Sequence, residues 1–254
     1  MLNDRLHSGI IKLEKSIQES GCADMAVKQT TGNCYICGVE LGKTAMKNHL
    51  LKEHNEKEDG QSCRLLKIEG TNKNYWLYID IPVDKTLSDI DSFLREIWLE
   101  CCGHLSAFKG PGRVQIGKSR KVGAFSVGDK ILHEYDFGST TETLITIIDE
   151  TYRKSQKPAV RLLARNTPPV FPCADCGKPS ESICTECACD WGSDPYFCDS
   201  CGEEHEHAEM LMPITNSPRM GVCGYDGELD KFMFSSSKII NKKGYAIRYS
   251  ELNK

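Results

Sequence analysis

The sequence has 254 residues, of which 39% are hydrophobic and 27% charged, with a formal net charge of −4. This composition is ordinary for a globular protein, and the negative charge argues against strong non-specific binding to nucleic acid. No apolar run reaches the roughly 18 residues of a transmembrane helix, and Asp4, Glu14 and Glu19 break up the N-terminal apolar pattern where a secretory signal would be continuous. We therefore expect a cytoplasmic protein.

Cysteine is unusually abundant, at 14 residues. In a reducing compartment these residues are not expected to form a disulfide framework. Pairs of cysteines separated by two residues indicate metal binding instead. Three such pairs lie between residues 173 and 201, and a fourth lies near the N-terminus. We expect two or three structural zinc ions.

Residues 1–28 are predicted to contain an amphipathic helix. Apolar side chains recur there at three- and four-residue spacing, and Gly21 is suited to end the helix. The stripe consists of Leu6, Ile10, Leu13 and Ile17.

Residues 29–58 resemble a two-Cys, two-His zinc finger, with the ligands Cys34, Cys37, His49 and His54. A helix from about Thr44 to Glu53 would place both histidines on one face. Eleven residues separate Cys37 from His49, where such fingers have about twelve.

A single finger has little affinity for DNA on its own. The predicted helix offers side chains that could meet phosphate, but no arginine for paired hydrogen bonds to guanine. These side chains are Lys43, Lys47, Asn48 and Lys52. Single fingers also serve as protein-binding modules, so both partner classes stay open.

Residues 62–166 are predicted to form the largest module. Strands are expected over 63–68 and 75–81, followed by a helix whose apolar stripe is Ile90, Phe93, Leu94, Ile97 and Trp98. Shorter strands are expected over 104–108, 113–116, 130–136, 143–148 and 159–164. Two strands, a helix and then a run of strands are typical of the α+β class.

Four motifs follow one another in this module: the strand Tyr75–Ile81, the helix start Thr86–Ile90, the strand Gly103–Phe108 and the strand end His133–Gly138. Their order resembles the Ri-plasmid open-reading-frame-three-like family, also described as transposon passenger proteins. That family usually continues the last motif with an aspartate and then a tryptophan, where this chain has Ser139 and Thr140. The resemblance implies an α+β domain with a mixed sheet and an association with mobile elements. It implies no established reaction.

Residues 167–212 carry the densest ligand set: Cys173, Cys176, Cys184, Cys187, Cys198, Cys201, His205 and His207. Because a structural zinc ion takes four ligands, this set predicts two ions. The spacing resembles a B-box-like cross-brace, in which the first and third pairs hold one ion and the second and fourth pairs the other. Sequential pairing is the alternative, and Cys189 or Cys223 could replace a histidine ligand. The tail, residues 213–254, is predicted to end in a strand over 244–249.

Charge is distributed unevenly along the chain. Segments 109–121 and 151–165 contain basic residues and no acidic ones, whereas segment 173–210 is rich in acidic residues and has Lys178 as its single lysine or arginine. An acidic zinc module suits a protein surface better than a phosphate backbone.

Three functions are compatible with these features. The first is a multi-module adaptor with a protein partner on the acidic zinc module. The second is a nucleic-acid-binding accessory factor that uses the finger and the two basic segments. The third is an enzyme centred on His104, His133 and Asp136, which requires the two histidines to converge in a cleft. The sequence offers no convincing catalytic constellation, membrane segment or small-molecule site, so we predict the adaptor, a zinc protein that is not an enzyme.

Overall fold

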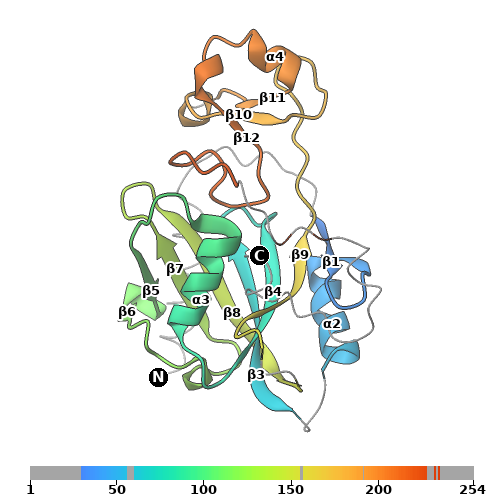
Figure 1. The fold of residues 1–254 in the computed structure, drawn as a ribbon, viewed down its shortest axis with the longest axis vertical. Coiled ribbons are helices and arrows are strands. Elements are labelled where there is room, and N and C mark those ends of the chain that lie inside the picture. The colour runs from blue at the N-terminus through green and yellow to red at the C-terminus, as the bar shows by residue number, and fades with distance from the viewer. Residues whose placement is uncertain are drawn as a thin grey trace, which may run out of the picture.

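The computed structural model describes residues 30–55, 60–154, 157–190 and 192–227, together with Phe232 and Phe234. The N-terminal helix and the C-terminal strand expected from the sequence lie outside these residues. The α+β class is confirmed: a nine-stranded sheet carries helices on its faces, and a small three-stranded sheet lies at one end (Figure 1). No helix in this described part is long and apolar enough to span a membrane.

The large sheet consists, in chain order, of β1 (Thr31–Cys34), β2 (Glu40–Gly42), β3 (Gln61–Gly70), β4 (Trp76–Pro82), β5 (Ser106–Lys109), β6 (Gln115–Ile116), β7 (Lys130–Tyr135), β8 (Thr141–Arg153) and β9 (Arg161–Asn166). Two short 3-10 turns, η2 (Pro111–Arg113) and η3 (Val122–Ala124), lie between β5 and β7.

In space the strands are ordered β2-β1-β9-β4-β3-β8-β7-β5-β6. Each neighbouring pair is antiparallel. The described sheet is therefore purely antiparallel, whereas the family resemblance implied a mixed sheet. The reason lies in the connections. Short turns join β3 to β4 and β7 to β8, and only antiparallel neighbours can be joined in this way.

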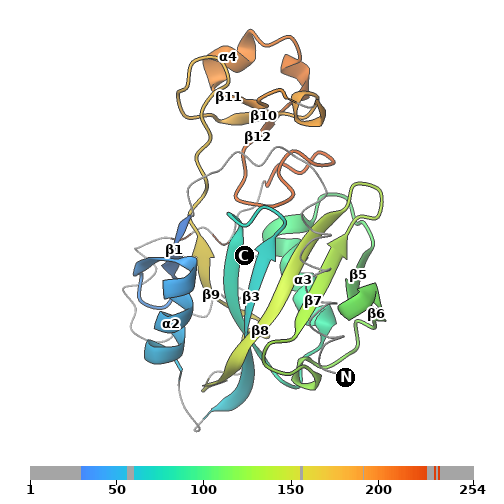
Figure 2. The ribbon, with the colours of Figure 1, turned by 180° about the vertical axis from the view of Figure 1, so that it is seen from behind.

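The helix α3 (Leu87–Leu94) covers one face of the sheet, and a single π-helical turn, η1 (Arg95–Leu99), extends it. The helix starts where the Asp89 carboxylate accepts a hydrogen bond from the Thr86 backbone N–H at 2.8 Å. Its predicted apolar stripe is buried in the main core. Figure 1 shows α3 in front of the sheet, and Figure 2 shows it behind.

The finger belongs to the same sheet, because β1 pairs with β2 on one side and with β9 on the other. The helix α2 (Lys43–Glu53) agrees with the predicted bounds. It buries Met46 and Leu50 against Trp76 and Tyr78 of β4. The helix α3 packs instead on Leu77 and Ile79 of the same strand. Because successive side chains of a strand point to opposite faces, α2 and α3 cover opposite faces of the sheet.

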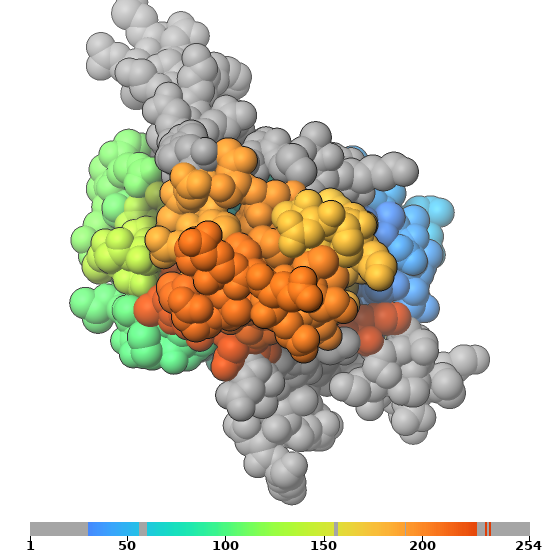
Figure 3. Space-filling model, turned by 90° about the horizontal axis from the view of Figure 1, so that it is seen from above, coloured from blue at the N-terminus to red at the C-terminus, as the bar shows by residue number. Residues whose placement is uncertain are grey.

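The C-terminal module contains β10 (Ser182–Cys184), β11 (Tyr196–Phe197), β12 (Leu211–Pro213), the short helix α4 (Asp199–Glu203) and the turns η4 (Cys187–Cys189) and η5 (Ala208–Met210). It forms one end of the molecule and, seen from above, lies over the middle of that end (Figures 1 and 3). Apart from cysteines, its hydrophobic cluster contains only Phe197 and the partly buried Leu211 among the described residues. So small a core is insufficient to fold a module unaided.

Arginines of segment 151–165 are buried in the large sheet. The carboxylate of Asp80 accepts hydrogen bonds from Arg153 Nη1 and Arg161 Nε, each at 2.9 Å. Arg165 donates to the backbone carbonyl of Asn216. These three charges therefore face a buried carboxylate and a chain segment, not the solvent.

Candidate metal centres

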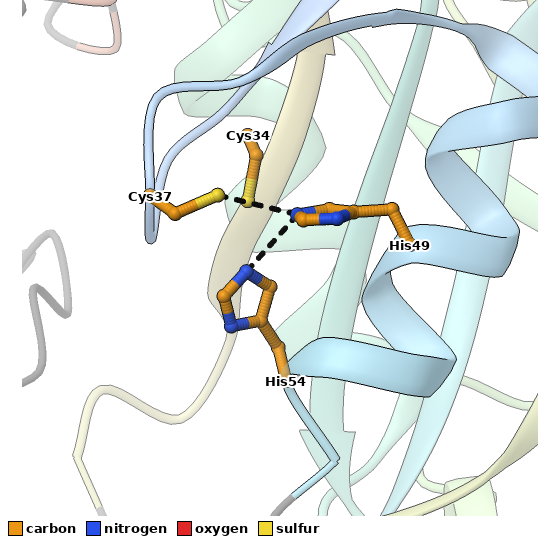
Figure 4. A group of neighbouring side chains, drawn as sticks. All are labelled: Cys34, Cys37, His49 and His54. Carbon is orange, nitrogen blue, oxygen red and sulfur yellow. Dashed lines mark hydrogen bonds between the residues drawn. The ribbon is translucent and has the colours of Figure 1, made fainter.

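The first centre lies between the β1–β2 turn and the end of α2 (Figure 4). The ligand atoms of Cys34, Cys37, His49 and His54 all lie within 4.8 Å of one another. His49 Nε2 lies 3.2 Å from Cys37 Sγ and 3.1 Å from His54 Nε2. Gly38, with φ 83°, gives the cysteine turn a left-handed residue. The eleven-residue interval thus still brings the four ligands together, and the group could hold a metal ion.

The two cysteines can bind a metal ion only after their thiols have lost their protons. Burial raises the pKa of the Cys34 thiol to about 11, so a bound cation must displace that proton. Burial, together with the neighbouring His49, lowers the pKa of His54. His54 is therefore held as the neutral imidazole that metal ligation requires.

The C-terminal module contains two groups, and each draws on two segments of the chain. Their ligand atoms again lie within 4.8 Å of one another. The first group is Cys173, Cys176, Cys198 and Cys201, and the second is Cys184, Cys187, His205 and His207. This is the cross-brace grouping, not the sequential one. Cys189 is exposed and lies in neither group, and Cys223 lies elsewhere, so neither replaces a histidine ligand here.

Distances between ligand atoms in the module lie within or close to those around a tetrahedral ion. Zinc bonds of about 2.3 Å to sulfur and 2.0 Å to nitrogen place neighbouring ligand atoms about 3.3–3.8 Å apart. The sulfurs of Cys176 and Cys198 are 3.6 Å apart, and Cys187 Sγ lies 3.4 Å from His205 Nε2 and 3.9 Å from His207 Nδ1. No described cysteine is in a disulfide.

Backbone groups prepare one thiolate of the four-cysteine group. Hydrogen bonds from the backbone of Cys198 and, next, of Cys176 lower the pKa of the Cys173 thiol to about 6, although desolvation opposes the shift. A thiolate at this position can ligate a cation without losing a proton at neutral pH. Gly177, with φ 70°, gives the turn after Cys176 a left-handed residue, as Gly38 does in the finger.

A fourth group comes together where the sequence predicted no metal. It consists of Cys101, Cys102, His104 and Cys223. Sequence reasoning missed it because adjacent cysteines lack the two-residue spacing of a zinc turn, and because Cys223 follows His104 by 119 residues. The local sequence Cys-Cys-Gly-His was the only available signal.

The histidines of the hypothetical catalytic site do not converge in a cleft. His133 is fully buried, with Nε2 2.8 Å from Asp91 Oδ1 and its ring against Phe108. His104 Nε2 faces the cysteines of the fourth group, and its Nδ1 lies 3.5 Å from Asp136 Oδ1. Only His104 and Asp136 of the three residues lie together.

Acid should destabilise the core around His133. Burial favours a protonated Asp91, but hydrogen bonds from His133, Lys118 and Ser106 hold the pKa of that carboxyl well below its usual range. Its contribution to stability is complete above about pH 4, the pKa of an unfolded aspartate, and is lost as the pH falls further. Burial also lowers the pKa of His133, so unfolding gains a proton below about pH 6.5 and stability again falls with acid.

We expect the free energy of unfolding, measured by urea titration from neutral to acidic pH, to decline in acid. Asp91→Asn should be less stable at neutral pH and should show a shallower decline below about pH 4. Acid also releases metal from cysteine and histidine ligands in both proteins, so the difference between them carries the result. Parallel curves would contradict this role of Asp91.

The fold and the ligand groups define an α+β protein with several Cys/His groups that could hold metal ions. No protein-family model matches the chain, and none of the curated proteins matches it. Among solved structures, the chain is similar to the crystal structure of a protein of unknown function from Methanosarcina mazei Go1. The two are 16% identical, with a TM-score of 0.36, over 42% of this chain and 70% of that one.

Proposed function

We propose that this chain is a zinc-organised adaptor that binds a protein partner through the acidic surface of its C-terminal module. Thiolate and imidazole ligands in sets of four suit zinc. Since protein atoms fill all four positions in each set, no position is open for a reacting water, and the ions are structural. In this proposal the protein is not an enzyme, and the central sheet is a scaffold of the Ri-plasmid open-reading-frame-three-like kind.

The observation that carries the proposal is the exposed acidic surface of the module. Every acidic residue of segment 173–210 except Asp194 is exposed. Five of them lie within eleven residues, in and after α4: Asp199, Glu203, Glu204, Glu206 and Glu209. A zinc ion held by four thiolates adds further negative charge, because the thiolates outnumber the charges of the ion. Such a surface attracts a lysine- or arginine-rich protein and repels phosphate.

The basic residues of segment 109–121 support the same choice, because several already have acidic partners. Lys109 and Arg113 lie 2.6 and 2.9 Å from the carboxylate of Glu134. Lys118 lies 2.8 Å from Asp91. The arginines of segment 151–165 are buried as well, so these six basic side chains could contact nucleic acid only by giving up their present partners.

Charge reversal tests the proposal. We expect the zinc-loaded full chain to bind a fluorescent library of lysine- and arginine-rich peptides, with an affinity that falls as salt rises. Replacing Glu203, Glu204 and Glu206 by lysine should weaken this binding at least tenfold. The matched control replaces three exposed acidic residues outside the module, Glu40, Glu53 and Asp84, and should bind like the wild type.

The same anisotropy titration with random-sequence DNA and RNA, at two salt concentrations, tests the alternative. We expect no binding at low salt. Salt-sensitive binding to nucleic acid that the module variant retains would instead support an accessory factor that contacts phosphate. Equal loss of peptide binding in the module and control variants would contradict a specific role for the acidic surface.

A further inference from the structure

The fourth Cys/His group joins two segments that are far apart in the chain. Cys101, Cys102 and His104 follow directly after η1, whereas Cys223 lies in the segment that leaves the C-terminal module. Their ligand atoms lie within 4.8 Å of one another, as in the three predicted groups. Cys102 Sγ lies 3.8 Å from Cys101 Sγ and 3.9 Å from Cys223 Sγ. His104 Nε2 lies 2.9 Å from Cys102 Sγ and 3.2 Å from Cys223 Sγ.

These separations fit a common tetrahedral ion better than a covalent link. Sulfurs bound to one zinc ion lie about 3.8 Å apart, whereas those of a disulfide lie about 2.05 Å apart. The contact between His104 Nε2 and Cys223 Sγ equals that between the finger ligands His49 and Cys37, at 3.2 Å in each. The fourth group is therefore as compact as the groups with a recognisable zinc spacing.

The orientation of His104 independently points to a metal. Its Nε2 faces the sulfurs, and its Nδ1 faces Asp136 Oδ1 at 3.5 Å. Asp136 is itself fixed by Arg219 Nη2 at 2.8 Å and by the backbone N–H of Gly138 at 3.0 Å. Metal-bound histidines characteristically donate their second ring N–H to a carboxylate, which sets the tautomer and orients the ring.

The backbone around the group repeats the turn seen at the predicted ligands. A glycine in the left-handed region follows Cys102, with φ 80° at Gly103, and another follows Cys223, with φ 65° at Gly224. The same arrangement follows Cys37 and Cys176 in the predicted groups. Cys223 itself has φ 52°, a conformation that is rare for a residue with a side chain and that needs its surroundings to hold it.

We propose that Cys101, Cys102, His104 and Cys223 bind a fourth structural zinc ion, which clasps the segment after the C-terminal module onto the central sheet. Protein ligands fill all four positions, so the ion has a structural role. Arg219 Nη2, 3.5 Å from Cys101 Sγ, adds a charged hydrogen bond to one of the sulfurs. The proposal goes beyond the adaptor function, since the three predicted centres could be filled without it.

Neighbouring contacts show what the clasp would hold. Ser217 Oγ donates to the carbonyl of Trp98 at 2.6 Å. The Asn216 side chain accepts a hydrogen bond from Asn166 Nδ2 and donates one to the Asn166 backbone carbonyl. The segment from Asn216 to Cys223 thus follows the central sheet until it reaches the metal ligands. With β9 leading into the module and this segment leading out, both ends of the module are tied to the same sheet.

Native mass spectrometry of the full chain, purified without chelator, tests the proposal. We expect four zinc ions in the wild type, three in Cys223→Ser and in Cys102→Ser, and four in Cys189→Ser. Cys189 is the matched control, because it is exposed but belongs to no group. The proposal would be overturned if Cys223→Ser bound the same number of zinc ions as the wild type.

A second measurement uses only the wild type, in case a variant fails to fold. Cys102 and Cys223 are exposed, as Cys189 is, so an alkylating reagent can reach all three. In zinc-loaded protein, peptide mass spectrometry should show rapid modification of Cys189, with Cys102 and Cys223 at least tenfold slower until chelator is added. Equal rates at the three thiols would overturn the fourth site. Protection of Cys37 and Cys176 in the same digest would show that the predicted centres nevertheless hold metal.

Discussion

Removing zinc should unfold the C-terminal module and leave the large sheet folded. The module has almost no apolar core besides its cysteines, and structural zinc in small finger domains contributes about 10–16 kcal/mol of folding free energy. The large sheet has a continuous core on the α3 face that contains no ligand of this module. The two parts should therefore respond separately to a chelator.

Hydrogen–deuterium exchange with and without chelator measures this difference. Amides of β10, β11 and β12 should lose protection, while those of β3, β4 and β8 retain it. Cys198→Ser should cause the same loss with zinc present, because it removes a ligand of the four-cysteine group, whereas Cys189→Ser should behave like the wild type. Unchanged protection of β10 after confirmed metal removal would show that the module folds without its ions.

Asp80→Ala should destabilise the large sheet by about 3–5 kcal/mol. Asp80 is 2% exposed and is the carboxylate partner of both Arg153 and Arg161. Removing it leaves two buried guanidinium groups without their negative charge, and breaking a buried ion pair on one side has a cost of this size. The exposed Asp84 is the matched control, and Asp84→Ala should change stability by less than about 0.5 kcal/mol.

Urea unfolding of the zinc-loaded chain, followed by tryptophan fluorescence, gives these free energies. Trp76 and Trp98 are both buried in the sheet core. A triple variant, Asp80→Leu with Arg153→Met and Arg161→Met, should recover much of the lost stability, because apolar side chains of similar volume can replace a buried ion cluster. Similar destabilisation by Asp80→Ala and Asp84→Ala would indicate that the cluster is screened by water.

Local sequence signals identified most of the strands and helices of the large sheet. Runs of strand-forming residues bounded by turn signals located β3, β4, β7, β8 and β9, and the apolar stripe from Ile90 to Trp98 located α3 with its π-helical turn. The order of the strands was beyond such reasoning. The pairing of β1 with β9 joins segments that carry no mutual signal, and it merges two predicted modules into one sheet.

The same division applies to the ligands. Short spacings expose the ligand types of the finger and of the C-terminal module, because each turn carries two of them. The fourth group depends on Cys223 approaching His104, a contact that only the tertiary fold creates. Charge was equally ambiguous. The sequence of segment 151–165 does not show whether its arginines contact phosphate or a buried carboxylate such as Asp80.

The pairing of β1 with β9 also sets an order of events during synthesis. The finger ligands end at His54, so this unit could take up its ion soon after that residue leaves the ribosome. Its β1 edge has no partner on the sheet side until β9, residues 161–166, has emerged. An early metal-loaded finger would then present an unpaired strand edge, which is open to association with other chains. We therefore expect nascent chains that end between these two points to be prone to association through this edge.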